Sequence, residues 1–149
     1  MHEPFYKYAY SKDRLAYRFV SIGNKGAIKK VVRFMPDEAE NLFTLGFGDW
    51  SADGGVDYYI KSNNGDMKEV ISTVIQIILH FYKKNPAARV IFYGSTDDRT
   101  TFYAQLLKRY YTDFSEIFYI YSVINESGRI IVTDYLPELK HKAFIIKKR

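Results

Sequence analysis

The stretch Arg89-Val-Ile-Phe-Tyr-Gly-Ser-Thr-Asp-Asp-Arg-Thr-Thr-Phe-Tyr-Ala-Gln-Leu-Leu-Lys-Arg-Tyr-Tyr111 joins two different patterns. The apolar run at 89–93 predicts a short buried strand that ends at Gly94. Ser95 and Thr96 then offer a helix cap, and apolar residues at three- and four-residue spacing predict an amphipathic helix over 97–114. Such a junction points backbone N–H groups outward from the start of the helix.

Hairpins and a long helix are predicted upstream of this junction. Apolar runs at 15–22 and 27–35 flank Gly23-Asn-Lys-Gly26, whose glycines supply the positive φ that a tight hairpin needs. Two further strands are predicted at 41–48 and 56–61. The turn cluster Ser62-Asn-Asn-Gly-Asp66 precedes a helix that ends before Pro86, and Asp66 with Glu69 forms a capping-box pattern.

The end of the chain again favours a hairpin. Runs at 118–124 and 129–133 flank Asn125-Glu-Ser-Gly128, and 143–147 predicts a last strand. The order is therefore β-β-β-β-α-β-α-β-β-β. We expect a single α+β domain over residues 1–149, a curved, mostly antiparallel or mixed sheet with two helices packed on one face.

Composition indicates a soluble protein of the cytoplasm. The chain of 149 residues has no Cys, which excludes thiol catalysis, disulfides and cysteine-based metal sites, and fits a reducing compartment. The first residues lack the basic-then-apolar order of a signal peptide. The longest near-apolar run, 70–82, is too short and too polar to span a bilayer, so we expect no membrane partner.

The charge is unevenly distributed along the chain. Residues 1–36 carry eight Lys or Arg against two acids, residues 37–66 carry seven acids against Lys61, and residues 67–149 are basic again. Neighbouring blocks could neutralise one another after folding. The pI near 9.2 is therefore weak support for a nucleic-acid partner.

Four strings stand out along the chain: Gly23-Asn-Lys-Gly26, Leu45-Gly-Phe-Gly-Asp49, Ser62-Asn-Asn-Gly-Asp66, and Gly94-Ser-Thr-x-x-Arg-Thr100 followed by Tyr103. Together they resemble an uncharacterised family of small single-domain proteins found mainly in Bacteroidota. They fall in the same order and cover nearly the whole chain. The resemblance implies a cytoplasmic single-domain protein, and it implies no activity for any residue.

The Gly94 junction is the first candidate site. Ser95, Thr96 and the N–H groups of the helix start could hold a phosphate or carboxylate, with Arg99 as a charged clamp and Tyr103 on the same helix face. The alternative is that Ser95 or Thr96 is only an N-cap. Asp97 and Asp98 favour this alternative, because two carboxylates in the first turn would repel an anion.

A second candidate is the loop Asp49-Trp-Ser-Ala-Asp53-Gly-Gly-Val-Asp57. Its oxygen-bearing residues follow most of the spacing of a calcium loop, with Asp49, Asp53 and Asp57 as ligands. The last position is Ile60 instead of Glu, and the flanks are predicted strands. An exposed hairpin loop of ordinary composition explains the same residues, and we expect no metal or other cofactor.

The first hairpin carries the third candidate, a basic sheet face. Its cations are Arg18, Lys25, Lys29, Lys30 and Arg33. The tyrosines at 6, 8, 10 and 17 lie nearby in sequence, and a basic face with aromatics can bind single-stranded nucleic acid. The alternative is a solvated strand edge that lysines guard against aggregation.

No motif names a reaction. The histidines His2, His80 and His141 have no metal-ligand neighbours at useful spacing, and no nucleophile motif is present. We expect a non-catalytic binding protein with nucleic acid as the leading partner. An enzyme or binder of a small phosphate- or carboxylate-bearing ligand near Arg99 and a homodimeric interaction module remain the alternatives.

Overall fold

A computed structural model describes residues 4–50, 56–57 and 64–149, with only the backbone described at 56–57. Its contacts divide the chain into two compact units, which are described in turn. The first unit comprises Met1–Met35 and Leu45–Pro86, and the second comprises Pro36–Thr44 and Ala87–Arg149. The strand at residues 42–50 runs through both.

The first unit is a small sheet with one long helix. Its strands are β1 (Ala9–Tyr10), β2 (Ala16–Gly23), β3 (Gly26–Pro36), β4 (Leu42–Trp50) and β5 (Val56–Asp57). The pairing order is β1-β2-β3-β4, with β5 on β4. The β2–β3 hairpin is antiparallel and closes at the Gly23–Gly26 pair. Of these two glycines only Gly26 has a positive φ, of 84°.

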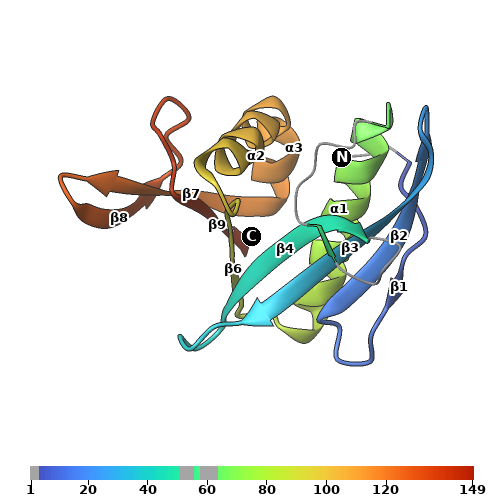
Figure 1. The fold of residues 1–149 in the computed structure, drawn as a ribbon. Coiled ribbons are helices and arrows are strands. Elements are labelled where there is room, and N and C mark those ends of the chain that lie inside the picture. The colour runs from blue at the N-terminus through green and yellow to red at the C-terminus, as the bar shows by residue number, and fades with distance from the viewer. Residues whose placement is uncertain (1–3, 51–55, 58–63) are drawn as a thin grey trace. The chain divides into compact units, whose positions relative to one another are not determined.

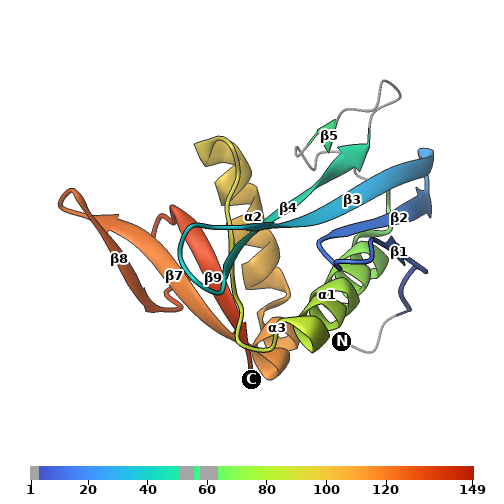
Figure 2. The same cartoon turned by 90° about the horizontal axis from the view of Figure 1, so that it is seen from below.

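Helix α1 (Met67–Lys84) covers one face of this sheet (Figures 1 and 2). The apolar side chains at three- and four-residue spacing are buried, as the sequence pattern predicts. Phe81 stacks on Phe34 of β3 with ring centroids 4.0 Å apart. Tyr17 and Phe19 of β2 are also buried. Since strand side chains alternate, the residues between them point to the opposite face.

In the second unit, two helices pack against hydrogen-bonded strands. Residues 42–44 of β4 pair in parallel with β6 (Arg89–Phe92), and the order continues through β9 (Ala143–Lys148), β7 (Phe118–Glu126) and β8 (Arg129–Asp134). The pairs β6–β9, β9–β7 and β7–β8 are antiparallel. Helices α2 (Asp97–Arg109) and α3 (Tyr111–Ile117) follow β6 (Figure 1).

One face of the sheet in the second unit carries both helices. Tyr103 of α2 meets Phe92 edge-on at 6.1 Å, and Phe114 of α3 lies 6.1 Å from Phe118. The opposite face carries the smaller apolar cluster of Val123, Ala143 and Ile145. The α+β class and a mostly antiparallel sheet are therefore confirmed, and the parallel β4–β6 pair makes the sheet mixed.

The helix count differs from the expectation of two. The single helix predicted over 97–114 is two helices in the structure, because Tyr110 leaves helical geometry at φ −106° and ψ 22°. The described residues thus form three helices. The tyrosine-rich start of the chain also adds the short strand β1, which pairs with β2.

Candidate functional site

The face of the first sheet turned away from α1 is rich in cations. Arg18 and Val20 of β2 alternate with the buried Tyr17 and Phe19, and Arg18 pairs with Val31 while Val20 pairs with Lys29. Cation and apolar side chain therefore stand opposite each other in both pairs. On this face the two cations are exposed, Val20 is 39% exposed and Val31 is buried.

A groove of about 440 Å³ lies on this surface, and we call it the basic groove. It is lined by Lys7, Arg18, Lys29, Val20, Val31 and Trp50, among others. The Arg18 guanidinium lies 4.5 Å from the centre of the Trp50 ring. Within the described part of the chain, no acid forms an ion pair with Lys7, Arg18 or Lys29. The groove thus joins cations to the aromatic residues Tyr6, Phe19 and Trp50.

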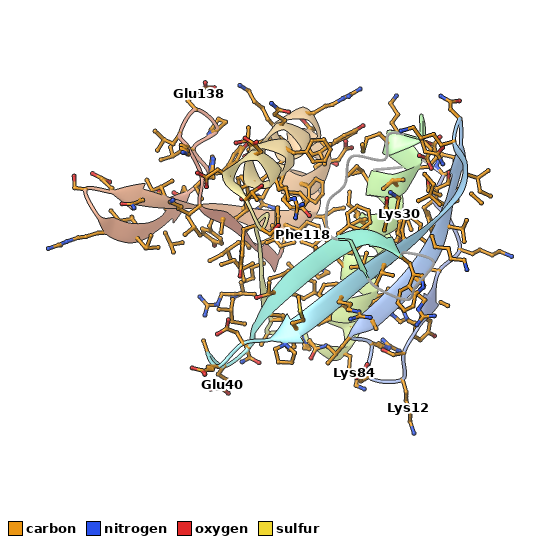
Figure 3. All side chains as sticks on the ribbon, in the orientation of Figure 1. Lys12, Lys30, Glu40, Lys84, Phe118 and Glu138 are labelled. Carbon is orange, nitrogen blue, oxygen red and sulfur yellow. The ribbon has the colours of Figure 1, made fainter. Side chains whose placement is uncertain are left out.

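Lys30 does not share this exposure, although it was expected among the phosphate-binding residues. It pairs with Phe19 on the α1 side of the sheet, where its side chain is only 2% exposed. Its ammonium group lies 2.5 Å from Oδ1 of Asp49 on β4. Lys30 is labelled in Figure 3. Strand alternation explains this placement, because adjacent residues of β3 point to opposite faces.

Arg33 and Lys25 take different positions around the groove. Arg33 stands two pleats beyond Lys29 on the same face and is half-buried. Lys25 lies at the exposed tip of the hairpin, where its backbone N–H donates to Oδ1 of Asn64 at 2.5 Å. The structure therefore brings Arg18 and Lys29 together in the groove, with Arg33 along the same strand face and Lys25 at the tip.

Of the tyrosines expected to accompany these cations, Tyr6 lines the groove, and Tyr8, Tyr10 and Tyr17 lie around His80. Tyr6 stacks on Phe19 with ring centroids 6.0 Å apart. Tyr8 and Tyr10 lie 5.8 and 4.3 Å from the His80 ring, and the Tyr17 hydroxyl is 2.7 Å from Nδ1 of His80. Burial raises the pKa of Tyr17 far above its usual value and lowers the pKa of His80. Tyr17 is buried beside α1, whereas Tyr10 is 53% exposed. Tyr6 and Phe19 also line the basic groove, together with Trp50.

At the Gly94 junction, the start of α2 bonds to the backbone groups that were expected to hold an anion. Thr96 is the N-cap of α2, and its hydroxyl accepts the backbone N–H of Arg99 at 3.3 Å. The N–H of Gly94 donates to Oγ1 of Thr100 at 3.0 Å. Two of the backbone donors that an anion would need are therefore already bonded. This geometry favours the capping alternative over an anion site.

Arg99 and Tyr103 lie on one side of α2, as their spacing predicts. The Arg99 guanidinium donates to the hydroxyl of Ser95. Burial raises the pKa of Tyr103 to about 12, and the charge of Arg99 acts in the opposite direction. Gly94 approaches this helix so closely that an added Cβ would lie 2.3 Å from Cβ of Arg99. Close packing is thus the reason for glycine at this position.

The expected calcium ligands are only partly within the described residues. Asp49 is engaged with Lys30. Asp53 lies outside the described residues, and at Asp57 only the backbone is described. Residues 4–50 and 64–149 contain no group of three or more His, Asp or Glu side chains that could hold a metal ion.

Asp66 has a role that the capping-box pattern did not indicate. It stands at the start of α1, but its side chain makes no cap bond. Instead its Oδ2 accepts the hydroxyls of Ser21 at 2.5 Å and Tyr6 at 2.6 Å. The Asn64 amide donates to the same Ser21 hydroxyl at 3.1 Å. The string Asn64-Gly-Asp66 therefore ties α1 to the β2–β3 hairpin and to the N-terminal segment.

A second buried pair, also absent from the sequence analysis, joins Ser122 to His141. Oγ of Ser122 lies 2.7 Å from Nε2 of His141 and accepts the N–H of Leu136 at 2.9 Å. This resembles a nucleophile beside a base, but Ser122 is fully buried and no substrate could reach it. The pair instead anchors the loop between β8 and β9. A spacing of 19 residues gives no sequence signal for such a contact.

The comparisons with known proteins give a family without an activity. Across the described residues, no helix has the length and apolar character needed to cross a bilayer. No curated protein and no solved structure is similar enough to this chain to count as a match. A family model does match residues 2–149, and the chain therefore belongs to the family of unknown function DUF6934.

Proposed function

We propose that this protein binds single-stranded nucleic acid through the basic groove of its first unit. The observation that carries the proposal is the combination of Lys7, Arg18 and Lys29 with Trp50 around one groove of about 440 Å³. A polyanion with planar groups is the class of ligand that uses both features. Phosphates pair with the cations, and a base stacks on the aromatic ring.

The arrangement on the strands supports a chain-like ligand. Cations at Arg18 and Lys29 lie on neighbouring strands, and Arg33 continues the same face along β3. A single phosphate would need convergent donors in a small pocket, whereas successive phosphates need cations spread along a surface. Val20 and Val31 add an apolar floor between the charges. Sheet faces of this kind can hold unstacked bases.

The position of Trp50 also favours single strands over a duplex. Its ring lies against the Arg18 guanidinium, which leaves the indole as one wall of the groove. A base can use such a ring only when it is not paired and stacked within a duplex. We therefore expect oligonucleotides of unpaired bases to bind more tightly than a duplex of the same length.

The test is fluorescence anisotropy with labelled oligo-dT and oligo-U of about 12 nucleotides, over a range of salt concentrations. Arg18→Ala and Lys29→Ala should each lower the salt slope by about one unit. Trp50→Ala should weaken binding by about tenfold at constant slope, which corresponds to about 1.4 kcal/mol. Lys83→Ala is the matched control, because Lys83 is exposed on α1.

Two outcomes would overturn the proposal. One is no binding of any oligonucleotide at low salt. The other is binding that falls equally in Lys29→Ala and Lys83→Ala, because attraction by net charge alone would then explain it. Lys30→Met should leave the salt slope unchanged, since its ammonium is buried against Asp49.

A further inference from the structure

Strand β8 is an edge strand with unusual exposure of apolar side chains. It pairs with β7 on one side, and no described strand pairs with its other side. Ile130 and Val132 are 65% and 56% exposed. The edge strand of the first unit, β1, has only two residues, whereas β8 has six. The four central residues of β8, at positions 130–133, are uncharged. They include no lysine or proline, the residues that usually protect an exposed edge strand from pairing with another chain.

The turn before β8 fixes which of its main-chain groups face the edge. Ser127 and Gly128 both have positive φ, of 53° and 82°, as a two-residue hairpin turn requires. Glu126 and Arg129 are therefore a hydrogen-bonded pair of the β7–β8 ladder. Since such pairs alternate, Ile130 and Val132 direct their N–H and C=O groups away from β7, toward the edge.

We infer that β8 pairs antiparallel with β8 of a second copy of this chain. Two copies of an edge strand that pair antiparallel are related by a two-fold axis perpendicular to the sheet. Each side chain therefore stays on its own face, and an even-numbered residue faces an even-numbered one while an odd-numbered residue faces an odd-numbered one. With Ile131 on the axis, Ile130 faces Val132 of the copy and Arg129 faces Thr133. Apolar side chains then meet apolar ones, and no like charges stand opposite each other.

The same register agrees with the direction of the main-chain hydrogen-bonding groups of β8 and with the apolar face that β8 shares with β7 and β9. Ile130 and Val132 form the hydrogen-bonded pairs across the axis, using the main-chain groups that point to the edge. Val132 also shares a face with Val123, its partner on β7, and this face continues the apolar cluster of Ala143 and Ile145. A copy seated on β8 would extend that apolar face. This dimer does not depend on the proposed nucleic-acid binding.

The first test is the mass of the full chain in solution, by light scattering and native mass spectrometry. The expected result is twice the 17.5 kDa of one chain. Val132→Lys should give the single-chain mass with an unchanged circular dichroism spectrum. Ile22→Lys is the matched control, since Ile22 is 64% exposed on β2, and it should keep the double mass. A wild-type monomer, or a Val132→Lys dimer, would overturn the inference.

The second test fixes the register and uses the absence of cysteine from the chain. Ile131 would face its own copy in a non-hydrogen-bonded pair, with Cα atoms about 4.5 Å apart, which a disulfide can span. Ile131→Cys should therefore form a disulfide-linked dimer on mild oxidation. Thr133→Cys should not, because the two copies of residue 133 would be about 13 Å apart. Efficient cross-linking at 133, or none at 131, would refute this register.

Discussion

The Lys30 ammonium lies 2.5 Å from Oδ1 of Asp49, and the two side chains are 2% and 22% exposed. An ion pair therefore lies on the α1 side of the first sheet, among Phe19 and Phe47. Taking charges out of water is costly, and each partner offsets the cost for the other. The string Leu45-Gly-Phe-Gly-Asp49 thus contributes a partly exposed counter-ion to a buried ammonium.

Asp49→Ala should lower the free energy of unfolding by about 1–3 kcal/mol, because the buried ammonium of Lys30 loses an acceptor that lies 2.5 Å away. Lys30→Met should cost clearly less, since it fills the same space with apolar atoms and Asp49 retains contact with water. Urea denaturation of both variants measures the difference. Equal losses would show that the burial of Lys30 does not determine the energy of the pair.

Asp66→Ala should lower the free energy of unfolding by about 3 kcal/mol, because the buried Ser21 hydroxyl and the half-buried Tyr6 hydroxyl both lose a charged acceptor. A simple capping role would predict about 1 kcal/mol. Glu69→Ala is the control: the capping-box interpretation requires a comparable loss there, whereas the observed network requires little. Chemical denaturation of the two variants separates these cases.

The sequence predicts well those strands, helices and turns whose pattern lies within a single continuous segment. The alternation along β2 and β3, the apolar stripe of α1 and the Asn125–Gly128 turn are all local patterns, and each element is present in the structure. The break at Tyr110 was not predicted, because the apolar spacing continues through it from Leu107 to Phe114. Tertiary packing decides such a break.

The candidate sites were harder to predict because they depend on which face is covered. Strand alternation alone separates Lys29 from Lys30, but it cannot say which of the two lies under α1. Similarly, Asp66 and Glu69 have the spacing of a capping box, but the Asp66 carboxylate instead accepts hydrogen bonds from the hydroxyls of Tyr6 and Ser21. These two residues lie 60 and 45 positions away in sequence. Contacts of this length leave no periodic signal in one sequence.

Gly94→Ala should destabilise the second unit by about 1–3 kcal/mol, as overpacking does in other proteins. The new Cβ would lie 2.3 Å from Cβ of Arg99 and 2.5 Å from the backbone nitrogen of Thr100, so the first turn of α2 must shift. Ser95→Ala is the control at an exposed neighbour and should cost less. Thermal melting of both variants provides the comparison. A neutral Gly94→Ala would show that the helix start moves freely.

The stability of the protein should fall as the pH drops below about 6.5, with His141 contributing to the fall. Burial lowers the pKa of His141 in the folded state, and the carbonyl of Leu139 offsets part of this. The unfolded chain therefore takes up the proton first, so stability is present above the unfolded pKa and is lost as the pH falls through the folded one. His141→Gln should be less stable than wild type at pH 7.5, and the deficit should shrink at pH 5. A constant deficit in urea denaturation at the two pH values would contradict this.

Tyr103 should produce the opposite dependence at alkaline pH. Burial raises its pKa to about 12, whereas the unfolded chain releases this proton near pH 10. Between these values only the unfolded state is ionised, so the contribution of Tyr103 is complete below about pH 10 and is lost as the pH rises through the window. Tyr103→Phe cannot ionise and should gain stability relative to wild type between pH 9 and pH 11. Denaturation midpoints of both proteins across this range, with absorbance of the phenolate near 295 nm, give the test. A gap between the two proteins that stays constant with pH would mean that Tyr103 is already accessible to water in the folded state.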